Sequence, residues 1–175
     1  MKKKEIPSVR RATSGDAGLL AELGARTFAD TFASDNTPED MEAYLSENFT
    51  PERQAAELSD PSSIFLIAEI DGEAAGYARL QSGRPPSCVA APDPLELARL
   101  YVDQAWIGRG VGEALMRACV GEAERAGRKA IWLGVWERNE RAKSFYIKWG
   151  FRKVGEQTFK LGSDLQNDWV MERPL

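Results

Sequence analysis

Hydrophobic positions recur along the chain at two spacings, which predict helices in some segments and strands in others. Two N-cap signals, Thr13-Ser14-Gly15-Asp16 and Thr37-Pro38-Glu39, precede apolar residues that recur at three- and four-residue intervals. The same intervals return later in the chain, where Gly127 and Gly150 supply C-terminal stops. Helices are therefore predicted to start near residues 14, 38, 52, 110 and 140.

Short apolar segments bounded by turn residues predict the strands. Asp71-Gly72 separates segments 64–70 and 73–81 and is a strong hairpin signal, and a proline-rich loop follows at 83–94. The remaining strands are predicted at 9–12, 95–102, 130–136, 151–158 and 168–172. This order predicts an α/β (α+β) fold, in which a mixed, mainly antiparallel sheet of about seven strands is flanked by helices in one domain, 1–175.

Composition excludes several classes of function. The chain has no histidine, which removes His-based nucleophile triads, imidazole general bases and zinc sites that need imidazole. A net charge of -4 at pH 7 argues against a nucleic-acid partner and suits a cationic small substrate. Two cysteines, Cys88 and Cys119, are too few for a disulfide scaffold. We expect no metal cofactor.

The N-terminus and the hydropathy pattern address localisation. No apolar run approaches the roughly 20 residues needed to span a bilayer. The basic residues after Met1 are followed by Glu5-Ile6-Pro7 instead of the apolar region of a signal peptide. We therefore expect a cytoplasmic protein with no membrane partner, and the sequence leaves a homodimer open.

A glycine-rich segment between a predicted strand and a predicted helix resembles a phosphate cradle. It reads Ile107-Gly108-Arg109-Gly110-Val111-Gly112, and backbone N–H groups at such a junction can hold a phosphate. No Lys-Ser/Thr follows at P-loop spacing, and Glu113 occupies the last required position of a dinucleotide fingerprint. On its own, the motif fits a turn without a ligand equally well.

A second motif favours a phosphate-binding turn over a turn without a ligand. Residues 139–151 read Asn-x-x-Ala-x-x-Phe-Tyr-x-x-x-Gly-Phe, and with Gly110 and Gly112 they resemble the GCN5-related N-acetyltransferases over nearly the whole chain. Ile107 departs from the Arg or Gln that is usual there, which removes one side-chain contact to the pyrophosphate. Segments 27–32, 36–39 and 131–137 are further similar to the bacterial Pai-type spermidine/spermine acetyltransferases.

This resemblance implies that acetyl-CoA is the co-substrate and that its pantetheine arm lies between strands 95–102 and 130–136. Tyr146 is implied as the general acid that protonates the coenzyme A sulfur, although its helical spacing with Phe145 and Trp149 also fits a core tyrosine. Asn139 also fits an N-cap, and Lys148 a solvated helix end. The cofactor-binding residues implied are Leu100, Tyr101, Val102, Ile107, Gly108, Arg109, Gly110, Val111, Gly112, Asn139 and Lys148.

The acceptor amine must lose a proton, because an alkylammonium is almost wholly protonated at pH 7. Glu96 is the candidate catalytic base, since it lies eleven residues before Ile107, where histone-acetylating members carry a glutamate. Strand alternation places it on one face with Leu100 and Val102, an apolar setting that suits a base. A solvated glutamate or a water chain is the alternative, and Glu137 is the reserve candidate.

A polyamine site needs carboxylates and aromatic faces around a long cation. The candidate substrate-binding residues are Phe28, Asp30, Phe32, Glu42, Tyr44 and Glu137. Solvated helix faces are the alternative for the charged members. The function predicted is acetyl transfer from acetyl-CoA to a primary amine, such as spermidine or spermine, by direct attack in a ternary complex. Another amine (a protein N-terminus, an amino acid or an aminoglycoside) and a non-catalytic acyl-CoA-binding module are the alternatives.

Overall fold

A seven-stranded mixed sheet forms the centre of the molecule, as predicted. The computed structural model describes residues 5–175. The strands lie in the order β1-β2-β3-β4-β5-β7-β6, and neighbours are antiparallel except for the parallel pair β4 and β5. They span Ser8–Arg11 (β1), Ser63–Ile70 (β2), Glu73–Gln81 (β3), Leu95–Val102 (β4), Ala130–Trp136 (β5), Arg152–Leu161 (β6) and Asp164–Pro174 (β7).

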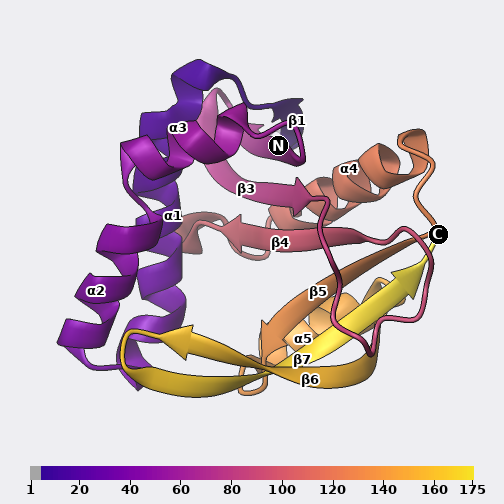
Figure 1. The fold of residues 1–175 in the computed structure, drawn as a ribbon. Helices are drawn as coiled ribbons and strands as arrows, with labels where there is room; N and C mark the ends of the chain where they lie inside the picture. Colours follow the sequence, from indigo (N-terminus) through magenta and orange to yellow (C-terminus); the bar gives the residue numbers. More distant parts are fainter. Residues whose placement is uncertain (1–4) are drawn as a thin grey trace.

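Helices cover both faces of this sheet (Figure 1). They span Ala17–Phe32 (α1), Pro38–Asn48 (α2), Pro51–Ser59 (α3), Val111–Arg125 (α4) and Glu140–Lys148 (α5). Side chains of α4 and α5 pack in the largest hydrophobic cluster with Ala78, Leu97 and Ile131. On the opposite face, Leu20 of α1 packs with Phe65 of β2. The central strands therefore lie between two helical layers.

The predicted helix boundaries follow from local capping. Thr37 Oγ1 accepts a hydrogen bond from the Asp40 N–H at 3.2 Å, and Asp16 Oδ2 accepts one from the Thr13 N–H at 2.7 Å. Gly127 and Gly150 end α4 and α5 with φ of +69° and +88°, a backbone region that favours glycine. Within residues 5–175, none of the helices has the length and apolar character needed to cross a bilayer.

The last two strands are longer than predicted. β6 and β7 pair from Arg152↔Glu172 to Leu161↔Asp164, so the polar segment 159–167 belongs to the hairpin. Many side chains of β6 are exposed, and its half-buried positions include the polar Gln157, so the apolar–polar alternation by which sequence patterns identify strands is weak.

The parallel pair β4 and β5 separates soon after it begins. Only Leu95↔Ile131 and Glu96↔Trp132 are paired, and Figure 1 shows the two strands diverging beyond this point. Main-chain N–H and C=O groups on the β5 side of the rest of β4 therefore have no strand partner. This opening was expected from the family resemblance.

A β-bulge in β4 corrects the predicted orientation of Glu96. The register pairs Arg79 with Arg99 but Leu80 with Leu97, so Ala98 has no residue opposite it. Alternation is thereby reset, and Glu96 shares a face with Arg99 instead of with Leu100 and Val102. Period-2 counting cannot detect such an inserted residue.

Candidate active site

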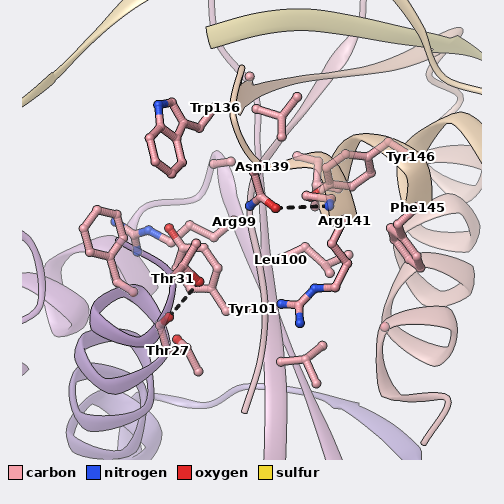
Figure 2. A pocket seen from close by; sticks show the side chains of 18 of the residues that line it. Thr27, Thr31, Arg99, Leu100, Tyr101, Trp136, Asn139, Arg141, Phe145 and Tyr146 are labelled. Atoms are coloured by element: carbon pink, nitrogen blue, oxygen red, sulfur yellow. Dashed lines mark hydrogen bonds between the residues drawn. The ribbon is translucent and has the colours of Figure 1, made fainter. Parts of the chain in front are cut away.

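A cavity of about 620 Å³ passes between the separated ends of β4 and β5. One part is lined from the α4 and α5 side by residues such as Val102, Gly110 and Tyr146. The other part is lined from the α1 and α2 side, by residues such as Phe28 and Tyr44. Figure 2 shows side chains of α1, β4 and the 139–146 segment around this space. The cavity therefore joins the two faces of the sheet.

The glycine segment forms an open turn at the start of α4. Gly108 and Gly110 have φ of +80° and +83°, and a Cβ built on either would meet no atom within 4 Å. The first helical hydrogen bond runs from the Ala114 N–H to the Gly110 carbonyl at 3.0 Å. The amides of Val111 and Gly112 precede it, so they have no intrahelical partner and lie at the positive end of the helix dipole. This geometry suits a diphosphate.

The side chains of the glycine segment behave differently from its backbone. Ile107 lines the cavity, whereas the Arg109 guanidinium lies over the Trp106 ring at 5.1 Å and pairs with Glu5 at 3.0 Å. Val111 is buried in the hydrophobic core. Two predicted cofactor-binding residues, Arg109 and Val111, are therefore outside the cavity lining, and their side chains are engaged elsewhere.

Two basic residues of α5 also differ in their position. Lys148, predicted to reach the coenzyme phosphates, is exposed and outside the cavity lining. Arg141 does line the cavity and was not predicted (Figure 2). Its place inside the Asn-x-x-Ala motif, from which Asn139 was predicted as a cofactor-binding residue, was the signal that would have identified it.

Three β4 residues that were expected at the cofactor lie along the cavity. Leu100 and Val102 pack against the core on the α4 side, and Tyr101 points to the opposite face. The Tyr101 ring forms an edge contact with Tyr77, with 5.5 Å between centroids. Tyr101 can therefore offer its main chain to a ligand between the strands, while its ring belongs to the aromatic packing.

Tyr146 lies at the wall of the cavity. Its side chain packs against Phe145 and Phe151, at centroid distances of 5.5 and 5.7 Å, and the residue is 8% exposed. Desolvation by burial raises the pKa of Tyr146, so its hydroxyl is protonated at neutral pH. Asn139 begins the same helix, where its Oδ1 accepts a hydrogen bond from the Ala142 N–H at 3.1 Å (Figure 2).

Three carboxylates line the cavity: Glu113 is exposed in the first turn of α4, while Glu96 and Asp168 lie in contrasting environments. Glu96 Oε2 accepts a hydrogen bond from Gln81 Nε2 at 2.5 Å. Asp168, which was not predicted as a site residue, is 8% exposed, and its Oδ1 is buried without a hydrogen-bond partner in residues 5–175. Desolvation, and then the charge of Glu137, raise the pKa of Asp168 to about 6. An aspartate inside a predicted strand, where the residue is disfavoured, was the available signal.

Aromatic rings line the α1 and α2 part of the cavity. Phe28 stacks on Tyr44 with 4.5 Å between centroids, and Phe32 packs on Trp136 at 5.3 Å. The acidic residues predicted beside them, Asp30, Glu42 and Glu137, are exposed and outside the cavity lining. The structure thus gathers the predicted aromatic residues and leaves these three carboxylates apart from them.

Arginine side chains also reach this part of the cavity. Arg99 pairs with the buried Glu57 of α3 through contacts of 2.7 and 3.1 Å, and Arg79 lies 3.3 Å from the same carboxylate. Desolvation alone would raise the pKa of Glu57, but hydrogen bonds and charge from these arginines lower it overall. Glu57 therefore compensates two buried cations. No sequence motif indicated this network.

Comparisons with known proteins agree with the fold. Residues 26–151 match the acetyltransferase (GNAT) family. An uncharacterized N-acetyltransferase of Lactobacillus delbrueckii subsp. lactis is 35% identical over 153 residues, 87% of this chain and 88% of that protein. The N-alpha-acetyltransferase RimI of Mycobacterium tuberculosis is 33% identical over 137 residues, 76% and 79% of the two chains.

A solved structure shares the same architecture. The PaiA N-acetyltransferase of Thermoplasma acidophilum, crystallised with coenzyme A, superposes with a TM-score of 0.78 at 22% identity, covering 97% of this chain and 99% of its own. The family match and the similar structure agree with the glycine turn and with the opening between β4 and β5. The chain belongs to the GNAT family and is an acetyl-CoA-dependent N-acetyltransferase.

Proposed function

We propose that this protein acetylates a primary amine of a small molecule, a polyamine such as spermidine or spermine, by direct attack in a ternary complex. The observation that carries the proposal is the cavity itself, which joins the glycine turn and Tyr146 on one face to an aromatic compartment on the other. Two substrates that enter from opposite faces can meet between β4 and β5. The cytoplasmic location predicted from the N-terminal sequence and the hydropathy pattern is part of this proposal.

On the cofactor side, main-chain amides at Gly110–Gly112 hold the diphosphate, and free main-chain groups of β4 orient the pantetheine arm. Acetyl-CoA supplies the activated thioester. Ile107 contributes no polar contact, so the backbone provides the diphosphate binding. Tyr146 donates its proton to the departing sulfur, a role that its protonated, cavity-lining hydroxyl can perform.

On the acceptor side, the support for a polyamine comes from the aromatic rings and from Asp168. Phe32 and Trp136 offer π faces to a cation, and Asp168 offers a carboxylate on the same side of the sheet. A polyamine places an ammonium group at the end of a slim alkyl chain, which suits a compartment with apolar walls. The external carboxylates Asp30 and Glu42 lie outside this compartment, so they are not needed by the proposal.

One observation favours a second acceptor class. Arg99 lines the cavity and carries a charge that would repel a polycation but attract a carboxylate or a carbonyl oxygen. An α-amine next to a carbonyl, as in a peptide N-terminus or an amino acid, has both features. The similarity to RimI, named an N-alpha-acetyltransferase, points in the same direction. Pairing of Arg99 with Glu57 lowers its attraction for an anion, which is why the polyamine remains the first proposal.

A panel of acceptors tests the proposal. The purified protein is incubated with acetyl-CoA and spermidine, spermine, free lysine, N-terminal peptides or an aminoglycoside, and thiol release is followed over time. We expect the highest kcat/KM with spermidine or spermine. A preference for N-terminal peptides would replace the polyamine by the second class. Binding of acetyl-CoA without thiol release on any amine would favour the non-catalytic module.

A further inference from the structure

Asp168 is a buried carboxylate for which the fold provides no partner. Only 8% of the residue is exposed, and its Oδ1 has no hydrogen-bond partner within the described chain. Transfer of a carboxylate out of water is costly unless a cation or hydrogen-bond donors replace the solvent. Such a group inside a cavity indicates that a ligand supplies the missing partner.

Strand register directs this carboxylate toward the acceptor compartment. Asp168 of β7 lies opposite Trp136 of β5 and Gln157 of β6, and residues that face each other across strands share one side of a sheet. The Trp136 ring packs on Phe32 of α1, so this is the side covered by α1. All four residues line the cavity.

Side chains of neighbouring strands lie over Gly134 on this side of the sheet. A Cβ built on Gly134 would lie 3.3 Å from Asp168 Oδ2 and 2.5 Å from Gln157 Nε2, so the absence of a side chain at Gly134 leaves room for both. Gly134 lines the cavity beside them. The titratable group that acts on Asp168 itself is Glu137, which follows β5. Tyr44 of α2 is acted on both by Asp168 and by the cation Arg99, which is already paired with Glu57.

A second cavity carboxylate, Glu96, is already engaged. Glu96 Oε2 accepts a hydrogen bond from Gln81 Nε2, and the positive charge of Arg79 acts on it across β3 and β4. An ammonium group would have to compete with Gln81 and Arg79 for the Glu96 carboxylate. Asp168 has no such competitor, so it is the better place for a ligand cation.

We propose that Asp168 binds the ammonium group of the acceptor and takes its first proton. This inference rests on the proposed function and names the group that prepares the amine for attack. The aromatic faces of Trp136 and Phe32 add cation–π attraction on the same side. An acceptor held in this way approaches the opening between β4 and β5 with its nitrogen leading.

In the proposed reaction, an ammonium N–H bond of the acceptor breaks and its proton passes to Asp168, which leaves a lone pair on the nitrogen. That nitrogen forms a bond to the acetyl carbon as the carbon–sulfur bond breaks, and the sulfur receives the proton of the Tyr146 hydroxyl. The second proton of the nitrogen returns to the Tyr146 oxygen, directly or through water. Asp168 releases its proton to solvent after the amide leaves.

The test compares Asp168→Asn with Asp164→Asn, a matched control at an exposed aspartate of the same strand outside the cavity. We expect Asp168→Asn to lower kcat/KM for the best amine about 100-fold, within the range for loss of a general base. Acetyl-CoA affinity should change less than about twofold in both variants. Spermidine binding to the enzyme–CoA complex, measured by calorimetry, should be lost only in Asp168→Asn.

Two readouts separate a role in proton transfer from a merely structural one. Methoxyamine is neutral at pH 7, so Asp168→Asn should slow its acetylation far less than that of spermidine. The wild-type kcat/KM for spermidine should rise through pH 6 and then level off, because the carboxylate must be ionised to bind and deprotonate the ammonium. In Asp168→Asn the rise should instead continue toward the pKa of the amine.

Several outcomes would overturn the inference. Asp168→Asn could keep the wild-type kcat/KM and pH profile, or it could lose acetyl-CoA binding. It could also acetylate spermidine and methoxyamine with equally reduced rates. If the variant does not fold, a wild-type kcat/KM for spermidine that does not rise through pH 6 and then level off would still refute the inference. Failure of the wild type on every amine would instead count against the proposed function. Calorimetric binding of spermidine still tests the Asp168 site in that case.

Discussion

At the scale of single residues, burial sets the protonation state of the groups that line the cavity. Burial raises the pKa of Tyr146 and so preserves a proton that the departing sulfur needs. Burial also raises the pKa of Asp168, to about 6, yet leaves it ionised for much of the time at neutral pH. The same physical effect therefore supports the proposed acid on one face of the sheet and the proposed base on the other.

Replacement of Tyr146 tests the acid directly. Tyr146→Phe removes the hydroxyl but keeps the ring packing against Phe145 and Phe151. We expect kcat to fall about 100-fold, a typical loss for a general acid, with little change in acetyl-CoA affinity. Tyr77→Phe is the control, because it removes a core hydroxyl outside the cavity lining. Equal kcat in Tyr146→Phe and wild type would remove the acid role.

The raised pKa of Asp168 also predicts a pH-dependent stability. The unfolded carboxyl has a pKa near 3.8, so between about pH 4 and 6 the folded state binds the proton more tightly. The unfolding free energy therefore falls as the pH rises from about 4 to 6, and this loss stays constant above pH 6. Asp168→Asn should raise the unfolding free energy at pH 8 by about 1–3 kcal/mol, with the gain shrinking toward pH 4. Urea unfolding at several pH values measures this difference, and a gain independent of pH would contradict it.

At the scale of elements, the junction before α4 is fixed by backbone conformation. Gly110 holds φ of +83° as the residue that begins the helix, and the space in front of it is open. Gly110→Ala should cost about 1–2 kcal/mol of stability, because an L-residue is strained in this conformation. The added methyl group would also occupy the diphosphate position, so acetyl-CoA should bind about tenfold more weakly, or about 1.4 kcal/mol.

Gly127→Ala provides the matched control for the glycine turn. Gly127 has φ of +69° and open space around it, but it lies at the far end of α4 and outside the cavity lining. We expect a similar loss of stability in a urea titration and an unchanged acetyl-CoA affinity in calorimetry. Equal affinity losses in the two variants would mean that the turn at Gly110 acts through stability alone.

Most elements were predictable because their signals are local. The Asp71-Gly72 hairpin and the helix that starts after Thr37 depend on residues close in sequence, and both are confirmed. The orientation of Glu96 was wrong, because the bulge at Ala98 arises from the pairing of two strands. Asp168 was missed for a similar reason, since only the register of β5, β6 and β7 shows what it faces.

At the scale of the whole molecule, the cavity between two faces makes a covalent acyl-enzyme unnecessary. A ping-pong mechanism needs a protein nucleophile near the thioester. Cys119 is fully buried in the core, where desolvation raises the pKa of its thiol to about 12, and Cys88 packs against Gly155 outside the cavity lining. Neither of these thiols can serve as a thiolate beside the bound substrates.

Steady-state kinetics can therefore distinguish the two mechanisms for the molecule as a whole. Double-reciprocal plots against the amine at several acetyl-CoA concentrations should intersect, because both substrates are bound before the carbon–sulfur bond breaks. Mass spectrometry after incubation with acetyl-CoA alone should show an unmodified chain. The Cys88→Ser, Cys119→Ala double variant should keep wild-type kcat, apart from a stability loss of about 1–2 kcal/mol at the buried site. Parallel plots, or an added acetyl mass that the double variant lacks, would establish a covalent route and refute direct attack.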